Sequence, residues 1–362
     1  MPTLRKRALE EYLRGRFGPH VELLSYGVIG QESSKGAQKR YGYGAPVKLT
    51  FQIGRQVRSA VLETMKPGPF GHEHMADRAQ AMLWDYDSYG RLPRHVKALD
   101  VGPFDAKQGL FSLAEAREFF VLNEWTDGAS YHADLERLAE GGPLRTLDGQ
   151  RTVALACYLA EVHATKCRDV GLYKRRLREL IGHGECIMGL TDSYPKRFSF
   201  ITEDLLRAVE EACNRWRWRL HDKTDRLSQV HGDFHPYNVL FRTGTDFAVL
   251  DRSRGEWGEP ADDVTAMTIN YLLNSLISRG KLQGSFEVLF RLFWDSYVEA
   301  SGDKEVMETA APFFAFRGLV LASPLWYPKL SIDIRRSLFR FIENVLDVPR
   351  FEPDRVNEYC GV

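Results

Sequence analysis

The residues best suited to chemistry in this 362-residue sequence lie in one polar segment of its second half. His231-Gly232-Asp233 is followed five residues later by Asn238, and Asp251 stands further along the chain. Two carboxylates and an amide supply the hard oxygen atoms that Mg²⁺ prefers. Phosphoryl transfer depends mainly on positioning and charge neutralisation, with a carboxylate near the attacking hydroxyl and metal across the phosphates. The segment therefore predicts a magnesium site suited to phosphoryl transfer.

A predicted β-hairpin would bring these groups together. Two short apolar runs, 239–241 and 247–250, flank a turn at Thr243-Gly244. One end of the hairpin follows the polar segment and the other precedes Asp251. Taken singly, aspartate and asparagine are common turn and cap residues; the joint pattern favours a functional site.

The same segment resembles a known family. The Asp-x-x-x-x-Asn spacing occurs in protein-kinase catalytic loops, but here His-Gly and not His-Arg precedes the aspartate. With His235-Pro236 following, the segment resembles the aminoglycoside phosphotransferase and choline kinase group of kinase-like enzymes. Two other segments, 159–163 (Leu-Ala-Glu-Val-His) and 258–263 (Gly-Glu-Pro-Ala-Asp-Asp), also resemble that family. The resemblance covers residues 20–275.

The resemblance implies an ATP- and Mg²⁺-dependent kinase that phosphorylates a hydroxyl of a small molecule, either a metabolite or an antibiotic. It makes Asp233 the catalytic base or the carboxylate that orients the hydroxyl. Asn238 and Asp251 would bind Mg²⁺. His231 would hydrogen-bond within the loop, and Asp263 would support it from the start of the next helix.

The resemblance also implies a loop over the ATP phosphates. Gly30, Ser33 and Ser34 lie in a polar, glycine-rich stretch whose amides and hydroxyls could cradle phosphate. An ordinary hairpin loop is an equal interpretation of that stretch.

The lysine that a kinase-like lobe carries on its third strand is harder to place. Glu63 stands where the basic residue is expected, and Lys66 follows three positions later. Lys48, on the neighbouring predicted strand, is the other candidate. We favour Lys66, with Glu73 or Asp77 as its acidic partner, because these two acids lie one helical turn apart. The alternative is that all these side chains are simply solvated.

The segment before residue 125 resembles the hinge whose backbone hydrogen-bonds adenine. Asn123, Glu124 and Trp125 stand at a break in composition along the chain. An ordinary linker between domains is the alternative interpretation.

Acceptor contacts are expected just after Asp251. Arg252 and Arg254 could clamp an anionic group or stabilise the transferring phosphoryl group, and we group Asp263 with them as an acceptor-side residue. The arginines favour an anionic or neutral acceptor over a polycationic aminoglycoside. Salt bridges at the rim of the site are the alternative.

The elements that must position these residues predict an α+β fold. The predicted strands are 21–30, 46–53, 57–65, 95–101 and 118–123. The predicted helices are 72–86, 146–165, 202–220, 269–277, 285–300, 310–322 and 332–346. With the resemblance, this order implies a bilobal protein-kinase-like fold. Residues 1–124 would form a small nucleotide-binding lobe with a β-sheet and one helix, and residues 125–362 a larger, mainly helical lobe for catalysis and substrate.

Composition excludes several classes of protein. The 49 basic and 49 acidic side chains give a net charge of zero, which argues against a nucleic-acid-coating or membrane-surface protein. Five scattered cysteines without a Cys-x-x-Cys pair indicate reduced thiols, and the N-terminus lacks a secretory signal. We therefore expect a cytoplasmic enzyme, monomeric or homodimeric, with a small-molecule substrate.

Two other functions stay open. Glu63 in the lysine position suggests a kinase-like pseudoenzyme that serves as a nucleotide-binding or scaffold protein. Protein kinase activity is a weaker option, because no Ala-Pro-Glu segment follows Asp251.

Overall fold

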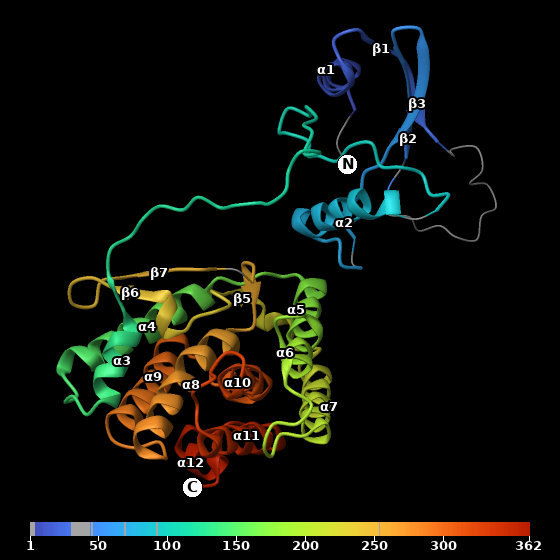
Figure 1. The fold of residues 1–362 in the computed structure, drawn as a ribbon. Helices are drawn as coiled ribbons and strands as arrows, with labels where there is room; N and C mark the ends of the chain where they lie inside the picture. Colours follow the sequence, from blue (N-terminus) through green and yellow to red (C-terminus); the bar gives the residue numbers. More distant parts are fainter. Residues whose placement is uncertain (1–3, 30–43, 45, 69, 92, 253) are drawn as a thin grey trace. The chain divides into compact units, whose positions relative to one another are not determined.

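The computed structural model describes residues 4–29, 44, 46–68, 70–91, 93–252 and 254–362. The chain divides into two compact units, Met1–Asn123 and Glu124–Val362 (Figure 1). The first contains a three-stranded sheet, and the second is mainly helical with two small sheets. The predicted α+β fold class is confirmed.

An antiparallel sheet in the order β1-β2-β3 forms the centre of the N-terminal unit. Its strands are β1 (Val21–Val28), β2 (Val47–Ile53) and β3 (Gln56–Leu62). A two-residue turn joins β2 to β3, so that Val47 lies opposite Leu62. Side chains of β2 alternate between buried and more exposed, as the period of two in a strand requires.

Helix α1 (Lys6–Phe17) covers one face of this sheet. Its Leu9 and Leu13 lie one turn apart and are buried against apolar residues of β1 and β2. Helix α2 (Met75–Ser88) follows the sheet and continues into a 3₁₀ turn, Tyr89–Arg91. The prediction of one helix in this part of the chain is therefore wrong, since α1 is a second one.

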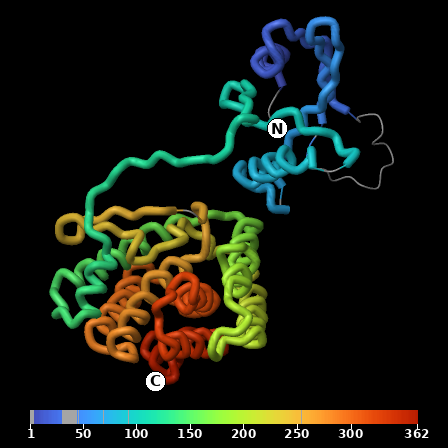
Figure 2. Tube along the Cα trace, in the orientation of Figure 1, coloured from blue at the N-terminus to red at the C-terminus, as the bar shows by residue number. Residues whose placement is uncertain are grey.

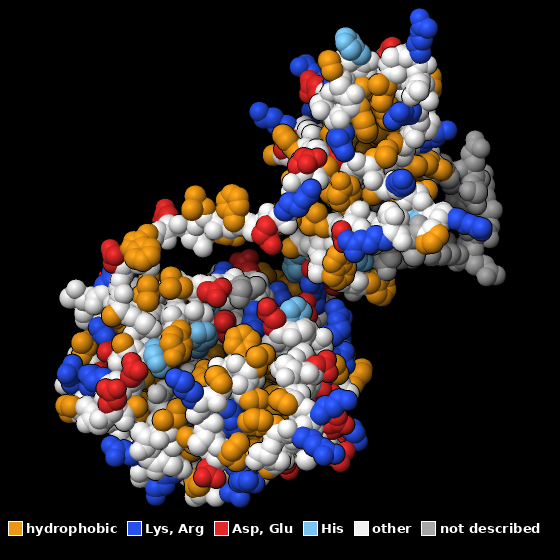
Figure 3. Space-filling view, viewed as in Figure 1, with side chains coloured by type: hydrophobic (Ala, Val, Ile, Leu, Met, Phe, Trp, Pro, Cys, Tyr) orange, Lys and Arg blue, Asp and Glu red, His pale blue; other side chains and the backbone are white. Residues whose placement is uncertain are grey.

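Two predicted strands, 95–101 and 118–123, are not formed. Asp100, within the first, accepts hydrogen bonds from the side chains of Tyr12 and Ser112 and holds an irregular segment in place. In the second, the apolar side chains from Phe119 to Leu122 are exposed, and Figure 3 shows hydrophobic side chains along this segment. A strand needs a partner for its backbone groups, and neither segment has a ladder partner among the described residues.

Ten α-helices make up most of the described part of the C-terminal unit. They are α3 (Tyr131–Ala139), α4 (Thr146–Ala164), α5 (Val170–Gly182), α6 (Ile187–Ser193), α7 (Glu203–Leu220), α8 (Pro260–Arg279), α9 (Ser285–Ser301), α10 (Val306–Ala322), α11 (Ile332–Asp347) and α12 (Val356–Cys360). Five of the six helices predicted for this unit both begin and end within four residues of those observed. Helix α8 begins nine residues before its predicted start.

The core of this unit is built around two of the helices. Helices α8 and α10 are buried on nearly all sides and pack against each other, with α11 packed on α10 and α4 on α9. Figure 2 traces these C-terminal segments through the unit. A helix that is apolar around its whole circumference belongs in a core, and α10 is the clearest case here.

Short strands lie beside the helices and frame the polar segment. One sheet has the order β4-β6-β7, and β5 pairs with β8. The strands are β4 (Ala129–Ser130), β5 (Ser228–Gln229), β6 (Val239–Phe241), β7 (Phe247–Val249) and β8 (Trp257–Gly258). The antiparallel pairing of β6 with β7 confirms the predicted hairpin. Within the described ranges, no helix has the length and apolar character needed to cross a bilayer.

Candidate active site

The polar loop that carries Asp233 begins where β5 ends. Strand β5 pairs antiparallel with β8, and the amide of Val230 donates to Glu256 O at 3.0 Å. The loop then runs through a 3₁₀ turn, Pro236–Asn238, into β6. Both ends of the loop are therefore fixed by backbone pairing.

The first turn of α8 supports the loop. Asp263 accepts the amide of His231 on Oδ2 and the amide of Gly232 on Oδ1, both at 2.7 Å. The Nε2 atom of His163, on α4, lies 3.2 Å from the same Oδ2, and its Nδ1 lies 2.9 Å from the hydroxyl of Tyr297. Burial raises the pKa of Asp263, but the hydrogen bond and charge of His163 outweigh it and hold the pKa below its ordinary value.

Asp263 does not reach solvent, because it is completely buried. Our grouping of Asp263 with the acceptor-side arginines is therefore wrong. Its position under two consecutive loop amides is that of a supporting residue.

Glycine is required at position 232 by the shape of the loop. Gly232 has φ +84°, in the region that side chains disfavour. A Cβ atom there would also lie 3.1 Å from the Cβ of Arg254. These two facts give a physical reason for the His-Gly pair that precedes Asp233.

Asp233 is held as an ion. Its Oδ1 pairs with Nη1 of Arg317, from α10, and its Oδ2 lies 3.5 Å from Nε2 of His235. Burial raises the pKa of Asp233, but the hydrogen bond from His235 and the charge of Arg317 outweigh burial and hold the pKa well below its usual range. The carboxylate can accept a hydrogen bond from a hydroxyl at neutral pH, while its basicity is low.

His231 serves the loop itself. Its Nδ1 accepts the amide of Asp233 at 3.3 Å, and its ring is buried edge-on to Phe234. The structure thus places His231 beside Asp233 as a hydrogen-bonding residue of the loop.

Asn238 and Asp251 lie at the same end of the β6–β7 hairpin. The amide of Leu250 donates to Asn238 O at 2.9 Å, so Asp251 follows the residue bonded to Asn238. The side-chain Nδ2 of Asn238 donates to Asp233 O at 3.0 Å, which leaves its Oδ1 as the available ligand atom. Asp251 is exposed and has a left-handed φ of +58°.

This donor set fits Mg²⁺. The described residues contain no group of three or more His, Cys, Asp or Glu side chains suited to a metal. Mg²⁺ commonly uses one or two protein oxygens together with waters and substrate phosphates. An amide oxygen from Asn238 and the carboxylate of Asp251 meet that requirement when phosphate supplies the remaining ligands.

A hollow of about 340 Å³ opens beside Asp251. Tyr158 and Val162 of α4, His231, and Leu250 to Arg252 all contribute to its lining. The exposed carboxylate of Asp251 therefore borders open space.

The two arginines after Asp251 contact the protein. Arg252 donates from Nε and Nη2 to Val230 O, at 2.9 and 2.8 Å, and from Nη2 to Glu256 O at 3.0 Å. Arg254 donates from Nη1 to the Sγ of Cys186 at 3.1 Å and lies over the ring of Phe316. Arg252 thus fastens the segment around β5 and β8, as a structural residue would.

The candidate nucleotide-binding residues belong mainly to the N-terminal unit. Gly30, Ser33 and Ser34 lie outside the described residues. Lys48 is exposed on β2, on the face opposite the core that α1 covers. Lys66 lies half-buried in the irregular segment after β3.

The two candidate acids do not share a helical face. Helix α2 begins at Met75, so Glu73 precedes it and the prediction that Glu73 and Asp77 lie one turn apart on a helix is wrong. Asp77 Oδ2 accepts the amide of His74 at 2.8 Å and caps the helix start.

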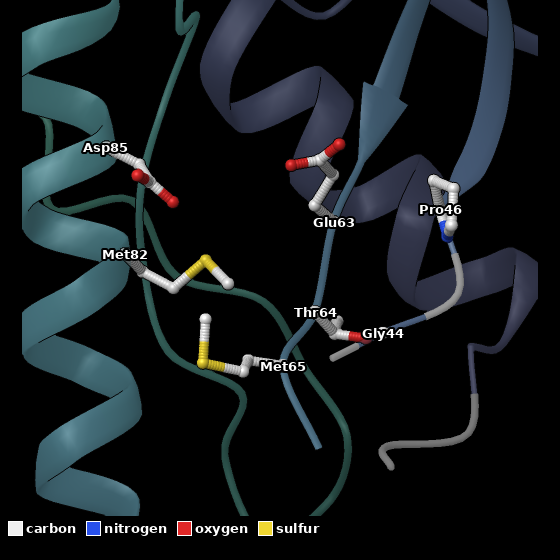
Figure 4. Close-up of a pocket in the computed structure, with 7 residues that line it drawn as sticks. All are labelled: Gly44, Pro46, Glu63, Thr64, Met65, Met82 and Asp85. Carbon is white, nitrogen blue, oxygen red and sulfur yellow. The ribbon is translucent and has the colours of Figure 1, made fainter. Parts of the chain in front are cut away.

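Glu63 lies outside the strand in which we expected it, because β3 ends at Leu62. It lines a hollow of about 180 Å³ together with Asp85 of α2 (Figure 4). The two acidic side chains come from opposite sides, with Met65 and Met82 also lining the space (Figure 4). Glu63 and Asp85 therefore bring two acidic side chains to this hollow.

The predicted hinge residues Asn123, Glu124 and Trp125 are exposed and carry no helix or strand. The indole Nε1 of Trp125 donates to Asp127 Oδ1 at 2.9 Å. Asn123 is the last residue of the N-terminal unit and Glu124 the first of the next.

Sequence reasoning missed Arg317. It lies inside the predicted helix 310–322, whose other side chains are apolar or small. A single arginine in such a helix was the available signal, because a charge in a core requires a partner.

Known proteins share features of this sequence and structure. Residues 93–279, more than half of the chain, match the phosphotransferase enzyme family. No curated protein matches the chain.

Three similar solved structures are distant in sequence. A choline kinase from Cryptosporidium parvum Iowa II is 11% identical, with 99% of this chain and 92% of that chain covered and a TM-score of 0.33. An amicoumacin kinase in complex with AMP-PNP and Ca²⁺ is 13% identical, with 98% and 97% covered and a TM-score of 0.41. A spectinomycin phosphotransferase in complex with ADP and spectinomycin is 12% identical, with 99% and 98% covered and a TM-score of 0.30.

Proposed function

Since this chain belongs to the phosphotransferase enzyme family, we propose that it transfers the γ-phosphate of ATP to a hydroxyl of a small molecule in the presence of Mg²⁺. The observation that carries the proposal is the ionised carboxylate of Asp233 in a fixed loop. Asn238 and Asp251 lie at the hairpin end that follows this loop.

Asp233 would accept the hydrogen bond of the acceptor hydroxyl and orient it toward the γ-phosphate. Because its pKa is held well below the usual range, Asp233 is a weak base, and the proton would move to it late in the reaction. This agrees with a transfer in which positioning and electrostatics dominate over early deprotonation.

Asn238 Oδ1 and the Asp251 carboxylate would hold Mg²⁺, which supplies charge neutralisation at the phosphates. The supporting residues act on geometry: Asp263 fixes two loop amides, and His231 receives the amide of Asp233. The loop is thereby held in place independently of any ligand.

For the nucleotide, we propose that residues 1–124 bind ATP and residues 125–362 carry catalysis and the acceptor site. Lys66, with Asp77 or Glu73, is our first choice for the phosphates, and Lys48 is the second. Gly30, Ser33 and Ser34 would form the phosphate loop. The backbone of Asn123, Glu124 and Trp125 would contact adenine.

The acceptor is a small hydroxyl compound, a metabolite or an antibiotic. Arg254 remains a proposed acceptor-side residue, whereas the donors of Arg252 are turned to backbone carbonyls. We place the enzyme in the cytoplasm, as a monomer or homodimer without nucleic acid. Five free thiols and a net charge of zero support this placement.

The test is turnover of Mg²⁺–ATP with a panel of amino alcohols, hexosamines and sugar-based antibiotics, read as ADP release. We expect at least one compound to stimulate release, and Asp233→Ala to reduce kcat by about 10²- to 10⁴-fold. The control is Asp246→Asn, an exposed acid of the same hairpin, which should leave kcat unchanged. Full transfer by folded Asp233→Ala would refute the proposal.

The second candidate is a pseudoenzyme that binds nucleotide or serves as a scaffold. It is favoured by Glu63 and Asp85, which line one hollow where a lysine–acid pair is expected. A thermal-shift titration separates the two: the absence of stabilisation at millimolar Mg²⁺–ATP, together with no turnover, would favour the scaffold.

A further inference from the structure

The guanidinium of Arg317 reaches the loop of Asp233 from helix α10, 84 residues further along the chain. Nη1 donates to Asp233 Oδ1, while Nη2 donates to Gly232 O at 3.0 Å and to Asp262 Oδ1 at 2.6 Å. One side chain therefore contacts the backbone of the loop, its carboxylate and the start of α8.

The surroundings of Arg317 are unusual for a charge. The side chain is 8% exposed and belongs to a helix whose residues are otherwise almost all apolar. Its guanidinium also lies over the ring of Phe316, at 4.6 Å from the centroid. A buried charge is weak evidence for stability, since well-packed apolar residues often do as well. A specific task at the loop explains its presence better than packing does.

The geometry of the guanidinium defines that task. Its two terminal nitrogens form a rigid fork, which fixes the direction of each hydrogen bond. With Oδ1 held by Nη1, the second oxygen, Oδ2, faces His235 at 3.5 Å. The rotation of the carboxylate is thereby restricted, and one oxygen stays clear of Arg317.

We propose that Arg317 is the positioning residue of the transfer: it fixes the carboxylate of Asp233 so that Oδ2 receives the acceptor hydroxyl. This inference rests on the proposed function and adds a residue to its machinery. Position 317 lies beyond residue 279, where the family match ends, so the family match does not supply this role.

Two substitutions separate charge from geometry. Arg317→Lys keeps the charge but replaces the fork with one ammonium, and Arg317→Gln removes the charge. The assay uses Mg²⁺–ATP and the panel compound of highest turnover, or water as acceptor if hydrolysis alone is seen. We expect kcat of Arg317→Lys to fall about tenfold. In Arg317→Gln we expect kcat to fall about a hundredfold, which is the loss that a small misplacement of a reacting group causes. KM for ATP should stay within about threefold, since neither change touches the residues proposed for the nucleotide.

Arg226→Lys is the matched control. Arg226 is also a buried arginine that bridges carboxylates, here those of Glu259, Asp303 and Glu305, but none of the three belongs to the loop of Asp233. We expect it to lower Tm while kcat stays within about twofold of the wild type. Two results would overturn the inference: folded Arg317→Gln with kcat within about threefold of the wild type, or an equal loss of kcat in Arg226→Lys and Arg317→Lys.

Thermal unfolding tests the pair without any turnover. Arg317→Gln leaves two carboxylates without their cation, those of half-buried Asp233 and of Asp262, and adding Asp233→Asn removes the first of these uncompensated charges. We expect the double variant to melt above Arg317→Gln alone, and additive losses of Tm would overturn the inference. If the wild type turns over neither a panel compound nor water, the proposed function fails, and this cycle alone decides whether Arg317 and Asp233 are coupled. Should Arg317→Gln not fold, the same cycle is run with Arg317→Lys.

Discussion

The carboxylate of Asp263 accepts the amide of Gly232 at 2.7 Å, so the residue before Asp233 is fixed by the first turn of α8. The same carboxylate holds the amide of His231 and contacts His163 of α4. The loop is therefore anchored to two core helices before any ligand binds. Such preorganisation places Asp233 at no further cost during the reaction.

Gly232→Ala tests how closely the loop is fitted. The substitution adds a Cβ at φ +84° and only 3.1 Å from the Cβ of Arg254. We expect the free energy of unfolding to fall by about 2 kcal/mol, because the close contact adds to a left-handed strain of about 1 kcal/mol. Activity should fall about tenfold, because Asp233 is the next residue. Urea unfolding and initial rates measure the two effects.

Gly244→Ala is the control for that experiment. Gly244 also has a positive φ, +63°, but no atom lies within 4 Å of the place that a Cβ would take. The variant should lose only about 1 kcal/mol, the cost of strain, and keep full activity. Equal unfolding free energies for the two variants would show that the contact with Arg254 does not matter.

Metal dependence should follow Asn238 and Asp251. Removing Mg²⁺ with EDTA is expected to abolish ADP release. Asp251→Asn, which removes the only charge of the pair, should raise the half-saturating Mg²⁺ concentration by about tenfold or more, in the range that altered metal sites show. A titration of rate against Mg²⁺ measures it. An unchanged half-saturating concentration in both Asp251→Asn and Asn238→Ala would contradict the assignment.

Lys66 and Lys48 can be distinguished by their effect on ATP. If Lys66 contacts the phosphates, Lys66→Ala should raise KM for ATP by about tenfold, the loss of roughly one charge-assisted hydrogen bond. Lys48→Ala, an exposed lysine on β2, should leave KM within about twofold. The reverse result would assign the role to Lys48, and no change in either would contradict both assignments.

Stability at low pH should depend on Asp303. Its Oδ2 lies 2.9 Å from Nη2 of Arg226. Burial raises the pKa of Asp303, but the hydrogen bonds and charge of Arg226 outweigh it and hold the pKa below its ordinary value. A carboxyl with a depressed pKa in the fold contributes stability above its unfolded pKa, about 3.9, and loses it as pH falls through the folded value.

We therefore expect Asp303→Asn to melt below the wild type at pH 6 to 7, with the difference in Tm shrinking below about pH 4. Tm measured between pH 3 and 7 tests this. Asp295→Asn, an exposed position on α9, is the control and should show a small difference throughout. A difference for Asp303→Asn that does not change with pH would contradict the assignment.

The family and the loop of Asp233 were predictable from the sequence. The His-Gly-Asp segment, Asn238 and Asp251 are local in sequence, and a hairpin between them places the last two at one end. The match over residues 93–279 confirms the resemblance drawn from those residues. Candidate site residues that lie in one short segment with fixed spacing can be recognised directly in the sequence.

Other features were not predictable for physical reasons. Helix α1 has a narrow apolar stripe formed mainly by Leu9 and Leu13. Its hydrophobic periodicity is therefore a weak signal for a helix in the sequence, and the stripe is recognised only against the sheet that it covers. The apolar run 118–123 has a strand-like composition, but strand formation depends on a partner that sequence does not reveal. Arg317 meets Asp233 only through the tertiary fold.

Helix α10 makes the last part of this chain a poor candidate for exchange between relatives. A chimera that took its C-terminal helices from another protein would also replace the counter-ion of Asp233, because Arg317 belongs to α10. Efforts to redirect such an enzyme toward new acceptors by grafting this segment would therefore alter the rate of the chemical step along with acceptor choice. Point substitutions that leave α10 intact are the safer route to a changed specificity.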